Sequence, residues 1–503
     1  MECNTKQDRY ALVILDKGIN TPLEYKIDQM ASIGTRVIVP LQKTMRKGTI
    51  VGFKNDTSLQ KVLCVEKVLP VEQTLSKSLF KLAQWMASYY ATPIRKVLKT
   101  IIPSSIRNDT KEKKQLFIKR LISPKKLSTL AANIREKHPS QAKILDVLLK
   151  KPSGILLSEL LELSKTSKSP ILSLQKQKII DVQFHQIDRS PLESMEFFPT
   201  KPKILNVDQK KALDNIAKQF GSHKTHLIHG ITGSGKTEIY IQAIKAAREK
   251  NMGTILLVPE ISLTFQTIER LKSRFSEKMG ILHHRLSDGE RFDIWNNINS
   301  GKINIVIGAR SAIFSPIKNL GLIIVDEEHE SSYKQTDEEP CYSARDVAIM
   351  RGKIENIPVV LGSATPSFES FYNAKKGKYQ LTTIGVRATK ASLPTIKVID
   401  MKNEYSKAEG FLLFSDSLLD GIKKRAAIGE QTLLFLNKRG FNSFIICKSC
   451  SATIKCPHCS VSLTYHKKIH AMVCHLCSYS FSPPPKICPE CKKGETLNFR
   501  GVG

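Results

Sequence analysis

The segment that most constrains the fold of this chain is residues 230–237, GITGSGKT, which fit the pattern G-x-x-x-x-G-K-[S/T]. An apolar run, THLIHG, leads into it, and the helix-forming segment TEIYIQAIKAA follows it. Glycines in such a strand-turn-helix context let successive amide N–H groups point at phosphate oxygens. We therefore expect a phosphate-binding loop that holds ATP. The expected nucleotide-binding residues of the loop are Gly230, Thr232, Gly233, Ser234, Gly235, Lys236 and Thr237.

A run of acidic residues, DEEH (326–329), follows the apolar segment LGLIIV. Carboxylates at the C-terminal end of a buried parallel strand face the nucleotide crevice. We expect Asp326, together with the hydroxyl of Thr237, to hold Mg²⁺ while Lys236 reaches the β- and γ-phosphates. Glu327 is expected to orient the attacking water. His329 is in place to connect hydrolysis to a bound polymer.

The charge of the chain indicates what that polymer is. The 503 residues include 78 lysines and arginines against 46 acidic residues, a formal net charge of +32. Such a surface attracts polyanions, so nucleic acid is the first partner to expect. The sequence has no apolar run of about 18 residues and no signal-like start, so we expect no membrane contact and a cytoplasmic location.

The cysteines are strongly clustered, because eight of the eleven lie between Cys447 and Cys491. They form four C-x-x-C pairs, namely Cys447/Cys450, Cys456/Cys459, Cys474/Cys477 and Cys488/Cys491. Two pairs complete one tetrahedral zinc site, so we expect two Zn²⁺ ions with structural roles. A thioredoxin-like redox pair is the alternative. The spacing leaves open which pairs share an ion.

Patterning along the chain predicts a multi-domain α/β protein, at roughly 100 to 200 residues per domain. We expect a small β-rich DNA-binding domain, a winged-helix-like domain, a RecA-like lobe with a parallel sheet, and the start of a second lobe interrupted by the zinc module. The corresponding ranges are 1–105, 111–200, 204–390, 391–446 with 492–503, and 447–491. Five nearly all-apolar runs predict the strands of the first lobe: THLIHG, TILLVPE, INIVIGA, LGLIIVDEE and IPVVLGSA.

Two segments before the first lobe leave a choice between nucleic-acid contact and packing. Residues 75–94 predict a helix on which Trp85, Tyr89 and Tyr90 either form a packed face or stack on bases. Residues 111–200 predict three short helices and an extended stretch, with residues 175–178 (QKQK) on the third as candidate DNA contacts. The lysine-rich stretch 123–138 is expected to be a solvated face.

The motifs in this order resemble those of superfamily 2 helicases, and within them the PriA family of primosomal replication-restart DNA helicases. The residues that carry the resemblance are GITGSGKT, LLVPEISLT (256–264), HHRLSDGER (283–291), VIGARSAIF (306–314), DEEHESSYKQ (326–335), YSARDVA (342–348), LGSATPS (361–367), LLFLNKRGF (433–441) and the eight cysteines.

This resemblance implies roles that the residues alone do not give. Gln209 would contact adenine, and Tyr333 with Lys334 would couple DNA contact to hydrolysis. The first domain would capture a 3′ end at a fork, and the motor would unwind DNA in the 3′ to 5′ direction. Implied partners are forked and single-stranded DNA, other primosome proteins, the replicative helicase and single-strand-binding protein. One zinc ion would take Cys447, Cys450, Cys488 and Cys491, and the other Cys456, Cys459, Cys474 and Cys477.

The sequence departs from the family pattern at its C-terminal end, Gly503. We expect the second motor lobe to be cut short, so that nucleotide binding is kept in outline while unwinding by this chain alone is doubtful. A non-catalytic scaffold that binds fork DNA is the first alternative function. The motor subunit of a restriction system is the second, and the eight-cysteine insertion counts against it.

Overall fold

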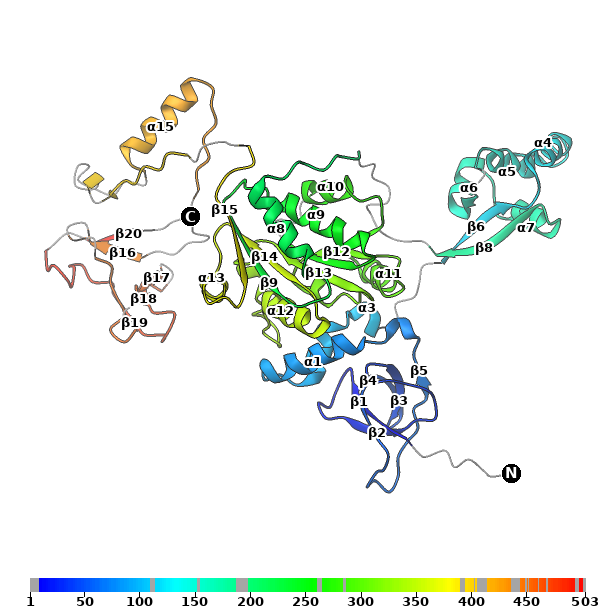
Figure 1. Cartoon of the computed structure of the whole chain (residues 1–503), viewed down its shortest axis with the longest axis horizontal. Helices are drawn as coiled ribbons and strands as arrows, with labels where there is room; N and C mark the ends of the chain where they lie inside the picture. Colours follow the sequence, from blue (N-terminus) through cyan, green and yellow to red (C-terminus); the bar gives the residue numbers. More distant parts are fainter. Residues whose placement is uncertain are drawn as a thin grey trace. The chain divides into compact units, whose positions relative to one another are not determined.

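The computed structural model describes residues 9–108, 114–151, 154–186, 198–259, 265–283, 286–389, 394–401, 403–404, 414–435, 444–447, 450, 452–459, 461–466, 469–493 and 497–500. They belong to two compact units, Met1–Ser392 and Leu393–Gly503 (Figure 1). Among the described residues, no helix combines the length and the apolar composition that a bilayer crossing needs.

The first unit begins with an antiparallel sheet of five strands in the order β2-β1-β4-β3-β5. The strands are β1 (Tyr10–Leu15), β2 (Leu23–Lys26), β3 (Arg36–Leu41), β4 (Thr44–Lys54) and β5 (Lys67–Val68). Alternate residues of β1, namely Ala11, Val13 and Leu15, are buried in one core. This period of two is typical of a sheet with one face turned inward, and it agrees with the predicted β-rich start.

Three helices follow, α1 (Lys77–Tyr89), α2 (Ile94–Ile101) and α3 (Ser104–Arg107). The hydroxyl of Ser76 caps α1 by accepting a hydrogen bond from Leu79 N. The helix ends before the predicted residue 94, because Pro93 disfavours helical backbone at the residue before it. The rings of Trp85 and Tyr89 stack on each other, 4.8 Å between centroids, which supports the packed aromatic face.

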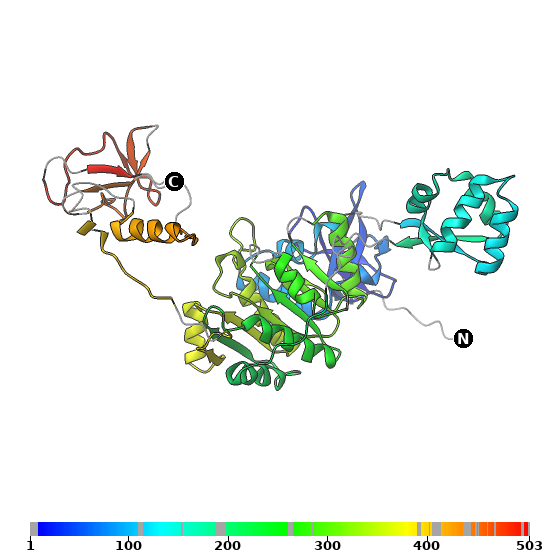
Figure 2. The same cartoon turned by 90° about the horizontal axis from the view of Figure 1, so that it is seen from above.

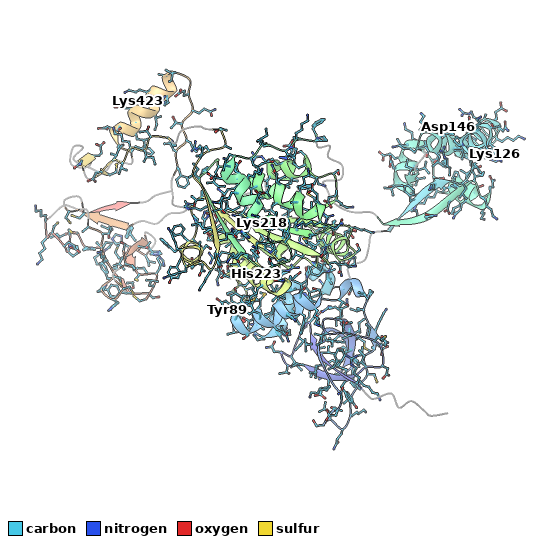
Figure 3. All side chains as sticks on the ribbon, viewed as in Figure 1. Tyr89, Lys126, Asp146, Lys218, His223 and Lys423 are labelled. Atoms are coloured by element: carbon cyan, nitrogen blue, oxygen red, sulfur yellow. The ribbon has the colours of Figure 1, made fainter. Side chains whose placement is uncertain are left out.

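A small helical domain comes next, and its strands form a sheet in the order β7-β6-β8. Its elements are β6 (Lys114–Arg120), α4 (Pro124–Asn133), α5 (Pro139–Lys150), β7 (Ile155–Leu156), α6 (Leu157–Ser164), α7 (Ser169–Lys176) and β8 (Ile180–Gln186). The lysine-rich stretch forms helix α4, and its Lys126 is exposed, in agreement with the expected solvated face (Figure 3). The helix also buries Leu127 and Ala131, whose spacing of four residues places them on one side.

The centre of the first unit is a seven-stranded parallel sheet in the order β11-β12-β10-β13-β14-β9-β15. Its strands are β9 (Thr225–Gly230), β10 (Gly253–Leu257), β11 (Met279–Leu282), β12 (Ile305–Gly308), β13 (Leu320–Val325), β14 (Val359–Ser363) and β15 (Gln380–Ile384). All five predicted strands are present. The two additional strands, β11 and β15, form the ends of the sheet.

Helices cover both faces of this sheet (Figure 1 and Figure 2). The helices α8 (Val207–Ala217), α9 (Lys236–Glu249) and α10 (Phe265–Lys272) contribute to one core, and α11 (Asp288–Asn299), α12 (Ala344–Glu355) and α13 (Phe368–Lys375) to the other. Successive residues of β13 alternate between the cores: Ile323 packs in one and Ile324 in the other. Burial on both faces explains the continuous apolar runs, and it fixes the carboxyl ends of the strands at one edge.

The second unit holds one long helix, α15 (Asp416–Ala427), and short strands. These are β16 (Phe444–Cys447), β17 (Thr464–His466), β18 (Ala471–Val473), β19 (Ser480–Phe481) and β20 (Leu497–Arg500). A strand was predicted at 432–440, but residues 432–435 form none and 436–440 lie outside the described residues. Leu433 and Phe435 are 94% and 81% exposed, because no described strand pairs with this run to bury it.

Candidate functional site

The phosphate-binding loop connects β9 to α9 and takes its shape from its glycines. Gly233 and Gly235 adopt φ values of 80° and 82°, which glycine reaches without strain. A Cβ atom on Gly230 would lie 2.5 Å from Ser234 Oγ, so a side chain there would close the cradle. Lys236 begins α9, and its buried Nζ donates to Gly230 O at 2.8 Å. The loop is thus folded in a form that can receive phosphate.

The buried polar atoms of the loop fit a nucleotide. Ser234 Oγ is buried and has no hydrogen-bond partner among the described residues. Buried polar groups in proteins are usually satisfied, so such an atom points to a missing polar ligand. The N-terminus of α9 offers a positive dipole end to the same place. The residues predicted for ATP binding therefore lie together in the cradle that the sequence indicates.

Asp326 follows β13 and faces the helix that starts at the phosphate-binding loop. Its Oδ1 accepts hydrogen bonds from Tyr240 on α9 and from Glu327 N, both at 3.0 Å. Burial raises the pKa of Asp326 to about 6, and the nearby carboxylate of Glu327 adds to the shift. A buried carboxylate with a perturbed pKa is a candidate functional group, and carboxylate oxygens are ligands for Mg²⁺.

Glu327 occupies an unusual backbone conformation, with φ at 44°. A residue other than glycine rarely adopts this left-handed region, and strain of this kind is concentrated at functional sites. The carboxylate of Glu327 lies 3.7 Å from Nδ1 of His329. The strained turn therefore directs the two predicted catalytic side chains toward each other.

Glu328 anchors the acidic stretch to two other loops, a role that the sequence did not reveal. Its fully buried carboxylate accepts from Ser367 N at 2.7 Å, from Ser370 Oγ at 2.8 Å and from Arg345 Nη1 at 3.2 Å. These partners belong to LGSATPS with the following helix and to YSARDVA. One indication of this role was present in the sequence: the segments that carry Ser367 and Arg345 are among the motifs shared with the helicase family.

His329 contacts the strand end that carries small hydroxyl groups. Its Nδ1 shares a hydrogen bond with Ser363 Oγ at 2.7 Å, and its Nε2 lies 3.5 Å from Thr365 Oγ1. Next to Ser363, Gly362 has no room for a side chain, because a Cβ atom would lie 1.6 Å from the hydroxyl of Tyr240. Tyr240 therefore touches both strand ends, and the sequence analysis did not identify it.

Gln209 lies beside the phosphate-binding loop, as the expected adenine contact requires, but its amide is already engaged. Its Oε1 accepts from Asn206 N at 2.8 Å, and its Nε2 donates to Ser234 O at 2.7 Å. The first bond is half of a capping box that begins α8. In this structure Gln209 fastens the helix to the loop, and its contact with adenine stays a prediction.

The loop after the acidic stretch holds Tyr333 in a position that differs from the expectation. Tyr333 was expected to take part with Lys334 in coupling DNA contact to hydrolysis, yet it is 2% exposed. Its hydroxyl donates to Asp326 O at 2.7 Å, and burial raises its pKa. In this conformation Tyr333 supports the backbone at Asp326 and cannot stack on DNA. Lys334, by contrast, is exposed.

A cavity of about 800 Å³ opens beside this loop. Its lining includes five cationic side chains, from Lys99, Arg107, Arg291, Arg310 and Lys334, and two acidic ones, from Asp337 and Glu338. Arg310 Nη1 donates to Lys334 O at 3.0 Å, and Lys334 Nζ donates to Cys341 O at 2.7 Å. Carbonyl acceptors orient these cations without neutralising them, so the cavity suits an anion.

Helix α1 contacts the same loop from outside the sheet. The hydroxyl of Tyr90, at the end of α1, accepts a hydrogen bond from Ser343 N at 3.2 Å. The ammonium group of Lys334 lies 5.6 Å from the centre of the Tyr90 ring. Farther along, Lys96 forms an exposed ion pair with Glu339 at 2.7 Å. The helices after the first domain thus hold the loop that also supports Asp326.

The candidate recognition helix, α7, presents its polar residues to solvent. Residues 175–178 are all exposed, while Ile171 and Leu174 pack in the domain core. This arrangement leaves the four side chains available for contact with DNA. Such contact remains a prediction, because the chain offers exposed lysines on many other surfaces as well.

The eight clustered cysteines come together in two groups of four. Cys447, Cys450, Cys488 and Cys491 form one group, and Cys456, Cys459, Cys474 and Cys477 form the other. Within each group the sulfur atoms all lie within 4.8 Å of one another. These are the sets that the resemblance implies and that spacing alone left open.

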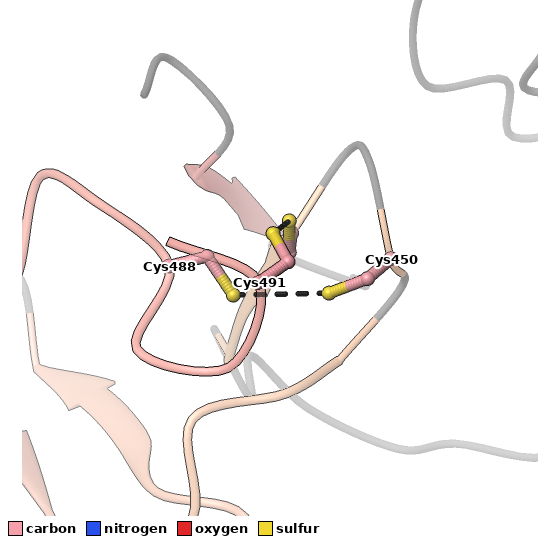
Figure 4. A group of neighbouring side chains, drawn as sticks. Cys450, Cys488 and Cys491 are labelled. Carbon is pink, nitrogen blue, oxygen red and sulfur yellow. Dashed lines mark hydrogen bonds between the residues drawn. The ribbon is translucent and has the colours of Figure 1, made fainter. Parts of the chain in front are cut away.

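The sulfur separations fit zinc. Cys450 Sγ lies 3.8 Å from Cys488 Sγ (Figure 4), and Cys447 Sγ lies 3.6 Å from Cys491 Sγ. A Zn–S bond of about 2.3 Å gives a tetrahedral edge of about 3.8 Å, whereas a disulfide would need about 2.05 Å. The hydrogen bond with Cys477 raises the pKa of Cys459 to about 12. A bound Zn²⁺ would favour the thiolate form of all four cysteines of a group.

The histidines of this region make contacts of their own. His470 Nδ1 shares a hydrogen bond with Tyr465 Oη at 2.7 Å, and the Nε2 atoms of His466 and His475 lie 3.2 Å apart. None of these histidines belongs to either group of four among the described residues. Complete cysteine sets leave no open coordination position, which favours a structural role for the metal.

A phosphate-binding loop, a buried acidic strand end and a hydroxyl-bearing strand end on one parallel sheet define a helicase motor domain. In agreement, residues 206–373 match the DEAD/DEAH box helicase model. Residues 12–103 match the 3′ DNA-binding domain of PriA, and residues 456–480 match the Cys-rich region of the PriA DNA helicase.

Whole-chain comparison gives the particular family. The chain is 42% identical to the replication restart protein PriA of Chlamydia pneumoniae, over 98% of this chain and 67% of that protein. It is 34% identical to the same protein of Bacillus subtilis, over 98% of this chain and 70% of the relative. The chain belongs to the replication restart protein PriA family. It spans about two thirds of the length of these relatives.

Proposed function

We propose that this chain is the ATP-binding part of a DNA helicase that acts in replication restart and moves along DNA in the 3′ to 5′ direction. One observation carries the proposal: the stretch 326–329 contacts both the nucleotide side and the loops beyond it. Asp326 meets α9 through Tyr240, and His329 meets the hydroxyl of Ser363. Tyr333 ties Asp326 to the loop that lines the cationic cavity.

The nucleotide side would use five residues in four roles. Lys236 would exchange its bond to Gly230 O for the β- and γ-phosphates. Thr237 and Asp326 would hold Mg²⁺, which neutralises the phosphate charge when it is bound. Glu327 would accept a hydrogen bond from the attacking water and orient it toward the γ-phosphate. His329 would then transmit the occupancy of the site to Ser363.

The nucleic-acid side is proposed on charge and on family membership. The cationic cavity would receive backbone phosphates, and the first domain would receive a 3′ end. Residues 175–178, at the end of α7 (Ser169–Lys176) and in the turn after it, would contact duplex DNA near a fork. The two zinc ions would hold the cysteine module as a surface for DNA or for partners. Proposed partners are the other primosome proteins, the replicative helicase and single-strand-binding protein.

The experiment is a DNA-stimulated ATPase assay on this chain, with binding of forked DNA measured in parallel. Lys236→Ala should abolish hydrolysis and leave DNA binding nearly unchanged, because the lysine is proposed to contact the phosphates of the nucleotide and not the DNA. Lys218→Ala, at an exposed position in the same lobe (Figure 3), is the matched control and should change neither. DNA binding without turnover by the unmodified chain would favour the scaffold function instead. Loss of DNA binding in Lys236→Ala would contradict the proposed role of the loop.

A further inference from the structure

The segment that follows β15 is fastened across the phosphate-binding loop at two points. Ile231 N donates to Ile384 O at 3.2 Å, and Ala388 N donates to Gly233 O at 2.9 Å. Both bonds join backbone atoms, so they do not depend on the side chains of the segment. Residues 385–388 therefore run along the rim of the cradle that would hold the nucleotide.

Arg387 is the charged residue of this crossing, and it lies directly over a glycine of the loop. A Cβ atom on Gly233 would be 3.7 Å from Arg387 Cγ, 3.8 Å from its Cδ and 4.0 Å from its Nε. The side chain of Arg387 is half-buried there, whereas Gly233 is exposed. The arginine stem thus covers one side of the loop and brings its guanidinium to the rim.

The position of the next residue indicates which side of the loop this is. The Cβ atom of Ala388 would lie 3.5 Å from a Cβ atom on Gly235, and Gln209 Nε2 would lie 2.5 Å from the same point. The segment that carries Arg387 therefore reaches the loop close to Gln209, the residue proposed to meet adenine.

We propose that Arg387 is a further nucleotide-binding residue, whose guanidinium pairs with the phosphate chain of the bound adenine nucleotide. This inference rests on the proposed ATP site. A nucleoside triphosphate carries about four negative charges, and Lys236, one helix N-terminus and the proposed Mg²⁺ would compensate only part of them. A guanidinium is always charged, and its fork of N–H donors matches phosphate oxygens. The role needs no residue from another lobe or chain.

A packing role is the competing explanation, because the stem of Arg387 fills space against Gly233. Arg387→Met keeps most of this stem and removes the charge, and Arg387→Lys keeps the charge and removes the planar fork. Lys378→Met is the matched control, because it removes one exposed cation just before the opposite end of β15. Each variant is first compared with the unmodified chain by thermal unfolding.

The test is equilibrium binding of fluorescent ADP and of inorganic pyrophosphate to the full 503-residue chain, without turnover. We expect Arg387→Met to weaken binding of both ligands about tenfold, Arg387→Lys to lose less, and Lys378→Met to bind within about twofold of the unmodified chain. Salt should weaken binding by the unmodified chain more steeply than by Arg387→Met.

Three outcomes would overturn the proposal. Binding by Arg387→Met within twofold of the unmodified chain would leave the arginine a packing residue. Weaker ADP binding with unchanged pyrophosphate binding would place the contact on the base or the ribose, not on the phosphates. Pyrophosphate binding by Arg387→Met that falls no more than that of Lys378→Met would likewise exclude a phosphate contact specific to Arg387. If Arg387→Met does not fold, Arg387→Lys decides, because unchanged binding of both ligands by this variant would exclude a contact that needs the guanidinium fork. If the unmodified chain does not bind ADP, the proposed function itself is refuted. If Lys236→Ala loses ADP binding and Arg387→Met keeps it, only the role of Arg387 is refuted.

Discussion

The nucleotide lobe and the cysteine module build their sites in opposite ways. In the lobe, seven buried strands and the helices on both faces bring the functional residues to one edge of the sheet. In the module, the strands β17, β18 and β19 have only two or three residues each. Its core is small, and two of its buried members, Cys456 and Cys474, are themselves candidate metal ligands.

The difference shows where the stability of each site comes from. A large apolar core holds the lobe, so Asp326 and Lys236 are positioned before any ligand binds. A core as small as that of the module cannot offset the conformational entropy of its loops, so the metal must supply the missing free energy. The fold of the lobe therefore positions the nucleotide site, whereas the cysteine module needs bound metal to keep its fold.

The largest expected effect is the response of the module to metal removal. Metal analysis should give about two zinc ions per chain, and a strong chelator should unfold residues 444–493, since structural zinc contributes on the order of 10 kcal/mol. ADP binding in the lobe should survive. Limited proteolysis with mass spectrometry would follow the module, and calorimetry would follow ADP.

Two exposed cysteines outside the groups provide the control for this experiment. Cys64→Ser and Cys341→Ser should leave the zinc content unchanged, whereas Cys474→Ser should lower it. One zinc ion or none in the unmodified chain would contradict the pairing of the sulfur atoms. If the chelator unfolds the module and abolishes ADP binding to the same extent, the two sites depend on each other, although each has its own core.

The same contrast explains how much of the fold the sequence predicted. Strands such as β13 are continuous apolar runs because both faces are buried, so their signal is local and was read correctly. The end strands β11 and β15 were not predicted. The apolar run of β11 has only four residues, and β15 contains three polar residues among five, so neither carries such a signal. The run at 432–435 looked like a buried strand but has no described partner, and burial depends on partners that a local pattern does not contain.

The residues of the candidate site also fall into those that a local sequence pattern predicts and those that only the folded chain brings together. The loop 230–237 could be predicted because its chemistry lies in one continuous stretch. The hydrogen bonds of Glu328 and the crossing of Arg387 depend on segments tens of residues apart that meet only in the folded chain. The buried position of Tyr333 depends in the same way on packing that its own stretch of sequence does not contain. The cysteine pairing is of this second kind, and it was expected from the resemblance rather than from spacing.

A smaller effect is expected at Asp326, because keeping its charged carboxylate buried before Mg²⁺ binds should reduce the stability of the folded chain. Its pKa in the folded chain is raised to about 6, above the ordinary value of 3.8, so folding disfavours the carboxylate. Asp326→Asn should therefore raise the free energy of unfolding above pH 6 by up to about 3 kcal/mol. The Asn oxygen can still accept from Tyr240. Denaturant unfolding without Mg²⁺ would measure the gain.

The sign of the pH dependence provides the check. The destabilisation caused by the carboxylate disappears as pH falls from 6 toward 4, so the gain from Asp326→Asn should shrink over that range. Mg²⁺-dependent ADP binding by the unmodified chain should weaken over the same range as Asp326 takes up a proton. Asp214→Asn, at an exposed position of α8, is the control. A gain that does not change with pH would exclude ionisation as its cause.

The smallest effect tests whether the nucleotide lobe works without the contact that helix α1 makes with its loop. Tyr90→Phe removes the acceptor of Ser343 N and keeps the ring beside Lys334, so it should reduce stability by about 1 kcal/mol. The loop that α1 holds also supports Asp326 through Tyr333, so DNA stimulation of ATPase activity should fall while ADP binding stays constant. Tyr89→Phe, at the exposed neighbouring ring, should change neither quantity. If Tyr90→Phe leaves DNA stimulation intact, helix α1 is only packed against the motor and takes no part in coupling.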